Sequence, residues 1–186
     1  INVAGAITIQ GGSASNQASN RNAGIFSQRQ GLQSINAGSI SVLGGTAGAN
    51  NNAFISSNNG GRQEISTGSV SVSGGTAGTN NGAFISSGAG QTINASGISL
   101  SGGGGNSDSV EIRQLGLASS QTITVTGGGT VAVKGGSGGS NKLVAALPPD
   151  SVYGYRSCRQ RPSRCRANLY ASCFPVPREY ERELRS

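Results

Sequence analysis

The chain has 186 residues, of which 32 are glycine, and it contains no Met, Trp or His. Its 14 Lys and Arg residues outnumber its 7 Asp and Glu residues, for a formal net charge of +7. No stretch approaches the roughly 18 apolar residues that a transmembrane helix requires. The lack of His, together with the lack of Cys before residue 143, argues against an acid–base or nucleophilic catalytic centre in that part of the chain.

A five-fold internal repeat organises residues 1–142. The triplet Gln-x-Ile occurs four times, at intervals of 30, 28 and 30 residues, and a copy without its Gln begins at Ile1. The repeats thus start near residues 1, 35, 65, 93 and 123. Residues 35–57 and 65–87 are identical at 17 of 23 positions without a gap. Repetition at this period predicts a solenoid.

Each repeat contains three short segments with the pattern of strands. The first surrounds Gln-x-Ile, the second is an alternating apolar pair such as Ile40 and Val42, and the third is Ala-x-Ile. Strict alternation is typical of a half-buried strand. In the third segment, the position of Phe54 and Phe84 is occupied by Glu111 in a later copy. We expect this position to face outward, because burying an unpaired charge is costly.

Glycine and asparagine fill the corners between these segments. The double glycine Gly44-Gly45 opens a loop that ends at Asn50-Asn51, and residues 74–81 are a near copy of it. Gly and Asn tolerate the left-handed backbone conformations of tight corners. The predicted fold is all-β: a single-stranded right-handed parallel β-helix, or solenoid, of about five coils with an irregular C-terminal tail. One coil cannot bury enough apolar surface to order itself, so the coils must stack.

The composition changes abruptly at residue 143. Residues 143–186 hold all five prolines, all three cysteines and eight arginines. The spacing of Cys158, Cys165 and Cys173 fits neither a zinc pattern nor a redox pair. We expect this tail to be disordered or translated out of frame. An alternative is contact with polyanions such as nucleic acid, anionic glycans or lipid headgroups. The arginines proposed for that contact are Arg156, Arg159, Arg161, Arg164 and Arg166.

The motifs of residues 1–142 resemble the repeats of filamentous-haemagglutinin-type exoproteins. The resemblance lies in Gln-x-Ile, the alternating Ile/Val pair, Gly-Gly, the Asn-rich loop and Ala-x-Ile. It implies the repeat shaft of a bacterial adhesin that is secreted or held at the outer-membrane surface by two-partner secretion. Its implied partners are an outer-membrane transporter during export and a receptor or glycan on a host or neighbouring cell. Because the chain begins inside a repeat, we expect it to be a piece of a longer polypeptide with targeting information elsewhere.

Few residues are candidates for a functional site. Phe54 and Phe84 are expected to stack on the outside of adjacent coils, either as an adhesive surface or simply as a covered aromatic pair. Glu111 and Arg113 share an outward face and are expected to form a weak surface pair. Asp108 follows a glycine-rich run similar to a calcium-binding repeat, but no Asp occupies that position in the other copies. We therefore expect no metal site, no catalytic residue and no cofactor.

The same outward position in each repeat holds a small polar residue. We expect these side chains to hydrogen-bond to one another as a ladder between coils. They are Asn2, Asn36, Ser66, Asn94 and Thr124.

Two functions compete with the adhesive shaft. The first is a β-helical enzyme that acts on polysaccharide, which needs clustered carboxylates, whereas residues 1–142 contain only Glu64, Asp108 and Glu111. The second is a shaft that carries a C-terminal effector in the tail. The low number of acidic residues and the lack of His disfavour both.

Overall fold

The computed structural model describes residues 1–13, 20–116, 119–138 and 143–144. Within these ranges the protein is all-β, with eleven strands and no helix. From the first strand to the eighth, long strands with odd numbers alternate with short strands with even numbers. The strands are β1 (Asn2–Gln10), β2 (Ala23–Ser27), β3 (Leu32–Leu43), β4 (Ala53–Ser57), β5 (Arg62–Ser73), β6 (Ala83–Ser87), β7 (Gln91–Ser101), β8 (Val110–Gln114), β9 (Gln121–Val125), β10 (Val131–Lys134) and β11 (Leu143–Val144).

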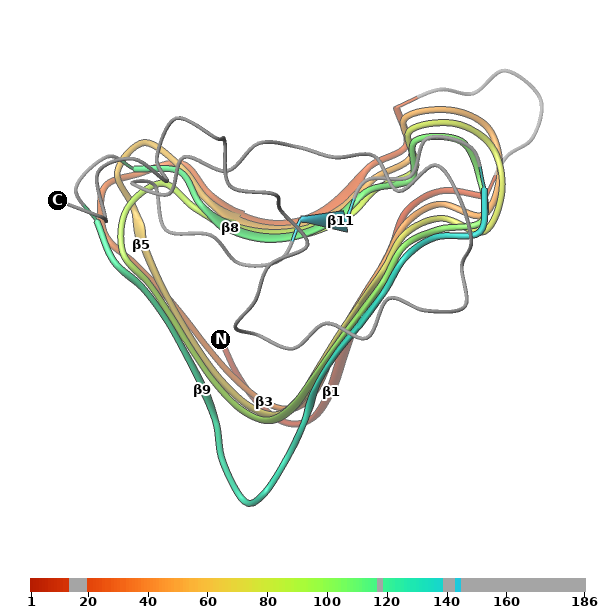
Figure 1. Cartoon of the computed structure of the whole chain (residues 1–186). Coiled ribbons are helices and arrows are strands. Elements are labelled where there is room, and N and C mark those ends of the chain that lie inside the picture. Colours follow the sequence, from red (N-terminus) through yellow and green to blue (C-terminus); the bar gives the residue numbers. More distant parts are fainter. Residues whose placement is uncertain (14–19, 117–118, 139–142, 145–186) are drawn as a thin grey trace, which may run out of the picture.

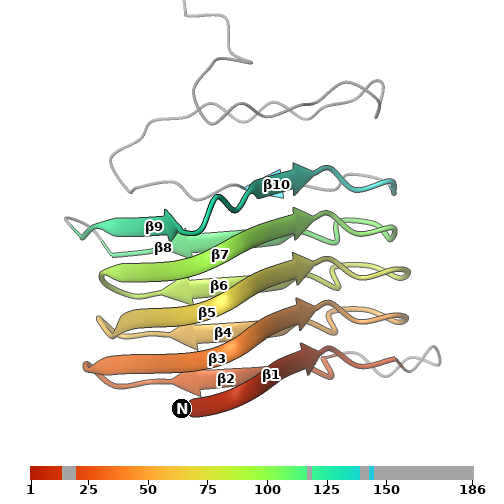
Figure 2. The same cartoon turned by 90° about the horizontal axis from the view of Figure 1, so that it is seen from below.

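The strands form two parallel sheets. Sheet A has the order β1-β3-β5-β7-β10 with β9 also paired to β7, and sheet B has the order β2-β4-β6-β8-β11. Seen along the axis, the strands of sheet A trace a V and those of sheet B lie across its open side (Figure 1). One coil is a sheet A strand followed by a sheet B strand, and the coils are stacked in chain order (Figure 2). This arrangement confirms the predicted parallel β-solenoid.

About four turns are described, slightly fewer than the five expected. The first four coils are β1 and β2, β3 and β4, β5 and β6, and β7 and β8. The next turn is represented by β9, β10 and β11. Its sheet A strand is divided, because residues 126–130 leave the sheet through a turn in which Gly127 and Gly128 have φ values of 65° and 73°.

Residues that occupy the same position in successive repeats are paired between neighbouring strands. Ile35 pairs with Ile65, and Ile65 pairs with Ile93. All three side chains are at most 1 % exposed. In sheet B, Ile55, Ile85 and Ile112 form a second buried column. Burial is worth about 1.5–3 kcal/mol for each such side chain, and it requires neighbouring coils on both sides.

A column of glutamines runs through the interior beside the isoleucines. Gln33, Gln63 and Gln91 are buried, and Gln121 is partly buried. The Nε2 of Gln63 donates to the Oε1 of Gln33 at 2.7 Å, and Gln91 donates to Gln63 at the same distance. Gln121 continues the column by donating to Gln91. This glutamine ladder satisfies buried amides from one coil to the next.

The double glycines serve a different purpose from the one expected. Gly44, Gly45, Gly74 and Gly75 are not among the residues with positive φ. They are needed because adjacent coils approach closely: a Cβ on Gly74 would lie 2.5 Å from the carbonyl oxygen of Asp108 and 2.6 Å from the nitrogen of Gly103. Left-handed conformations occur later in the same loops, at Gly48, Asn50, Gly78 and Asn80. The prediction was therefore right for the end of each corner loop and wrong for its start.

Candidate functional site on the outer face of sheet B

Phe54 and Phe84 lie on the outer face of sheet B, as the sequence predicted. Each follows a buried Ala and precedes a buried Ile, and each is itself partly buried. The two residues are paired in register, with ring centroids 5.4 Å apart and ring planes inclined by 9°. Stacked aromatic pairs of this kind contribute about 0.5–1.5 kcal/mol beyond their buried area. The pair therefore helps to hold the second and third coils together.

The stacked pair is the centre of a longer stripe. Phe26 meets Phe54 edge-to-face at 6.2 Å, and the guanidinium of Arg113 lies 5.5 Å from the centre of the Phe84 ring. We call Phe26, Phe54, Phe84 and Arg113 the aromatic stripe. Gly24 makes room for it, because a Cβ there would collide with the ring of Phe54. Phe26 was not among the residues selected from the sequence. It lies two residues after the outward position of Gly24, and residues two apart in a strand share a face, which would have predicted that it faces outward.

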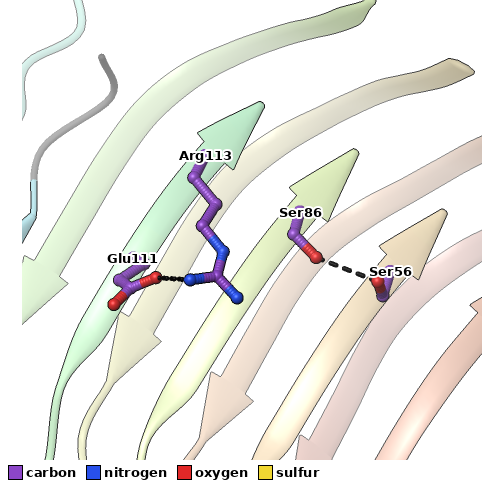
Figure 3. Close-up of polar contacts among 4 residues, drawn as sticks. All are labelled: Ser56, Ser86, Glu111 and Arg113. Atoms are coloured by element: carbon purple, nitrogen blue, oxygen red, sulfur yellow. Dashed lines mark hydrogen bonds and ion pairs between the residues drawn. The ribbon is translucent and has the colours of Figure 1, made fainter. Parts of the chain in front are cut away.

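Polar contacts flank the stripe. Arg113 Nη1 lies 2.6 Å from Glu111 Oε2, which confirms the expected pairing (Figure 3). Their side chains are 39 % and 18 % exposed, respectively. This pair holds the guanidinium beside Phe84, although such pairs contribute little stability by themselves. On the neighbouring strands, the hydroxyls of Ser56 and Ser86 lie 2.9 Å apart (Figure 3).

The geometry limits what the stripe can bind. Phe54 and Phe84 stack on each other, and their flanks meet Phe26 and Arg113. A ligand such as a sugar ring would need a free aromatic face to stack on. Phe26, at 47 % exposure, is the most accessible aromatic ring of the stripe. Phe54 and Phe84 thus pack against each other within the stripe, and Phe26 is its more exposed ring. The adhesive role of Phe54 and Phe84 stays a prediction.

The outward polar ladder on sheet A is only partly as expected. Its register is confirmed, since Asn2 pairs with Asn36, Asn36 with Ser66, Ser66 with Asn94 and Asn94 with Thr124. All five side chains are exposed. No hydrogen bond joins any two of these five side chains. The side-chain ladder between coils is formed instead by the buried glutamines.

The residues equivalent to Asp108 in the two preceding coils are the asparagines Asn51 and Asn81, so no other Asp occupies this position. Asn51 Oδ1 accepts from the backbone N–H of Arg21, Asn81 Oδ1 from that of Asn51, and Asp108 Oδ1 from that of Asn81. These distances are 2.8–2.9 Å. The three side chains thus occupy one buried column at the corner loops. The repeat alignment does not reveal this equivalence, because the loop before Asp108 is one residue shorter than the loops before Asn51 and Asn81.

The shorter loop explains why the last position is an acid. Asn51 and Asn81 use their Nδ2 to donate to the carbonyls of Ala47 and Ala77 at 2.7 Å. In the shorter loop the matching partner is a donor, the N–H of Gly105, which lies 3.0 Å from Asp108 Oδ2. Two acceptor oxygens suit this position, and an amide does not. Burial raises the pKa of Asp108 above its ordinary value, and the hydrogen bonds from Asn81 and Gly105 oppose that shift.

Replacing Asp108 with Asn is expected to lower the free energy of unfolding by about 1–3 kcal/mol, because an amide N–H would then face a backbone donor. The measurement is urea denaturation followed by circular dichroism. Glu64→Gln is the matched control, since Glu64 is exposed on sheet A and its change is expected to stay within about 0.5 kcal/mol. Equal stability of Asp108→Asn and the parent chain would contradict this account of the loop.

The remaining candidate residues are outside the described ranges. Arg156, Arg159, Arg161, Arg164 and Arg166 belong to the tail, so their proposed contact with polyanions stays a prediction. In the part that the structure describes, no three His, Cys, Asp or Glu residues are grouped closely enough to hold a metal ion. Nor does that part contain a helix of the length and apolarity needed to cross a bilayer.

Comparison with known proteins adds no further assignment. No family model matches the sequence, and neither the curated proteins nor the solved structures include a significant match. Any functional conclusion therefore rests on the sequence motifs and the solenoid geometry.

Proposed function

We propose that this chain is a structural and adhesive shaft segment of a large bacterial surface or secreted protein. The observation that supports it most is the matched register of β3, β5 and β7 in sheet A and of β2, β4, β6 and β8 in sheet B, with continuous buried columns of Ile and Gln. A solenoid of this kind is rigid along its axis and presents the same surface positions at every step. Such a rod holds contact surfaces away from a cell and allows many weak contacts to act together.

The arrangement of charges supports a shaft rather than a polysaccharide-cleaving enzyme. Glu64 lies on sheet A, Asp108 is buried in a corner loop, and Glu111 is paired with Arg113 on sheet B. Glycoside cleavage uses two carboxylates that flank the scissile bond. The three carboxylates of the described residues occupy three separate environments and form no such pair.

The resemblance to filamentous-haemagglutinin-type repeats supplies the rest of the proposal. The polypeptide is exported through an outer-membrane transporter, and the shaft contacts a receptor or glycan on a host or neighbouring cell. The direct test is attachment of beads coated with the purified chain to epithelial and bacterial cells. Attachment no greater than that of beads coated with an unrelated β-solenoid would contradict the adhesive part of this function.

If the stripe contributes to adhesion, Phe26 is the residue to change. Phe26→Ser is expected to weaken cell attachment roughly fivefold or more, as truncation of an anchoring aromatic does, with little loss of stability. Leu115→Ser is the matched control, because Leu115 is 52 % exposed but lies outside the stripe. Phe84→Ser is expected to cost about 1–3 kcal/mol of stability through lost stacking and burial. Unchanged attachment of Phe26→Ser beads would remove the stripe from the binding surface.

A further inference from the structure

The sequence contains two Asn-Gly dipeptides, Asn59-Gly60 and Asn81-Gly82, in very different surroundings. Asn followed by Gly is chemically labile: the Gly backbone nitrogen can attack the Asn side-chain carbonyl carbon, because no side chain shields that nitrogen. We propose that Asn59 is a site of spontaneous deamidation in the folded protein and that the fold protects Asn81. The two sites share the same local sequence chemistry, so any difference between their rates reports the structure.

Asn59-Gly60 is a tight turn at an exposed corner. Asn59 and Gly60 have φ values of 53° and 76°, and the N–H of Gly61 donates to the carbonyl of Asn58 at 3.0 Å. These are features of a type I′ turn, for which Asn-Gly is the preferred pair. Both residues are exposed. Exposed turns open locally at low free-energy cost, which gives the chain the freedom that ring closure needs.

The turn is open on the Cα side of Gly60, whereas its backbone nitrogen faces Gly88 of the next coil, where an added Cβ would lie 3.0 Å from it. A Cβ placed on Gly60 would come no closer than 3.6 Å to another residue, the Cγ of Gln30. The Gly60 nitrogen makes no hydrogen bond within the described structure. Among the described residues, the Asn59 side chain makes one hydrogen bond, from Nδ2 to the carbonyl of Gln28 at 2.9 Å. Ring closure at this turn therefore requires the loss of one side-chain hydrogen bond and of none at the attacking nitrogen.

At Asn81-Gly82, hydrogen bonds hold both the backbone nitrogen that would attack and the side chain that it would attack. The N–H of Gly82 donates to Asn52 Oδ1 at 2.8 Å, which occupies the nitrogen that would attack. Asn81 is fully buried, its Nδ2 donates to Ala77 at 2.7 Å, and its Oδ1 accepts from the N–H of Asn51 at 2.9 Å. A Cβ on Gly82 would lie 3.1 Å from the carbonyl oxygen of Ser109. The side chain cannot turn toward the backbone without opening the corner.

The reaction needs only water. A bond forms between Gly60 N and Asn59 Cγ, the Cγ–Nδ2 bond breaks, and ammonia leaves with the proton of the Gly60 amide. Water then opens the resulting succinimide at either carbonyl, which yields Asp or isoaspartate. The product carboxylate has no N–H to donate to Gln28, so the corner loses one bond between the first and second coils. Modification at this site would thus loosen one edge of the solenoid and add a negative charge there.

The test is to age the purified full chain at mildly alkaline pH and to follow both sites by peptide mass spectrometry. Trypsin separates them, because cleavage after Arg29, Arg62 and Arg113 yields peptides 30–62 and 63–113, each with one Asn-Gly. We expect Asn59 to deamidate at least about tenfold faster than Asn81 in the folded chain, because Asn81 must first undergo local opening. In urea the two rates should converge. A deamidation rate of Asn59 no faster than that of Asn81 in the folded chain would overturn the proposal.

A variant tests the cause of the protection. Asn52→Ala removes the oxygen that accepts from the Gly82 N–H and leaves the Asn59 turn unchanged. It is expected to accelerate deamidation of Asn81 about threefold or more, with the Asn59 rate unaltered, and circular dichroism checks that the variant is folded. An unchanged Asn81 rate in a folded Asn52→Ala chain would overturn the protective role of this hydrogen bond.

Discussion

Replacing Gln63 with Glu is expected to lower the free energy of unfolding by about 3–5 kcal/mol, the range found when a buried charge is left without a partner. Gln63 is 0 % exposed and lies in the middle of the glutamine ladder. Its Nε2 donates to Gln33 Oε1 at 2.7 Å, and its Oε1 accepts from Gln91. A carboxylate keeps the acceptor but loses the donor, so an anion would face the oxygen of Gln33. Urea denaturation of the purified chain measures the loss.

The matched control is a new carboxylate at an exposed position of the same strand. Ser66→Glu places it on β5 (Arg62–Ser73), on the outer face of sheet A. This substitution is expected to change stability by no more than about 0.5 kcal/mol. If Gln63→Glu were no more harmful than Ser66→Glu, the glutamines would not form a buried ladder in solution.

Replacing Gly74 with Ala is expected to cost about 3 kcal/mol, the upper part of the range for an overpacked interior. The added methyl group would lie 2.5 Å from the carbonyl oxygen of Asp108 and 2.6 Å from the nitrogen of Gly103. Both atoms belong to the backbone of the next coil, so a side-chain rotation cannot relieve the overlap. The third and fourth coils would have to separate at this corner, which would also disturb the bond from Asn81 to Asp108.

Gly97→Ala is the control for this experiment. A Cβ on Gly97 would lie 3.9 Å from its nearest neighbour, the carbonyl oxygen of Thr130, and Gly97 is not among the residues with positive φ. Ala at such a position is expected to change stability by less than about 1 kcal/mol, and it can raise stability by restricting the unfolded chain. Similar midpoints for the two variants in thermal unfolding would show that the coils do not approach closely at Gly74.

These two substitutions concern the spacing of coils, on which the proposed shaft depends. The glutamine ladder keeps polar atoms satisfied inside the rod, and the double glycines allow the corners to stack at strand spacing. Both features recur in successive repeats, so the contacts between one pair of neighbouring coils are repeated between the next pair. A rod of any length can be built in this way, whereas the aromatic stripe is specific to the coils that contain Phe26, Phe54 and Phe84.

The sequence was sufficient to predict the class of fold and the orientation of most strands. Period-two alternation places Ile40 and Val42 on one face, and repetition at 28–30 residues brings equivalent positions of successive coils together. Comparison of Phe54 with Glu111 also predicted correctly that this position faces outward. These inferences succeed because alternation and repeat length are properties of the chain itself and do not depend on details of packing.

Other features of the candidate site could be found only from the tertiary structure. The sequence suggested hydrogen bonds along Asn36 and Ser66, although Gln33 lies two residues before Ile35 and so shares its inward face. Whether an inward glutamine is tolerated depends on a partner amide in the next coil, which alternation alone does not reveal. The accessible aromatic residue, Phe26, also emerges only when its neighbours are seen to cover Phe54 and Phe84.

By itself the sequence determined that this protein is a stack of similar β-coils, because each repeat has too little apolar surface to fold alone. Only the tertiary structure decided which polar groups hold the stack together. Asp108 illustrates the reason: deletion of one loop residue replaces a carbonyl partner with the N–H of Gly105, and an acid then fits where Asn81 is required in the previous coil. Hydrogen-bond complementarity is set by the orientation of individual backbone groups, and that orientation follows from the way the coils pack.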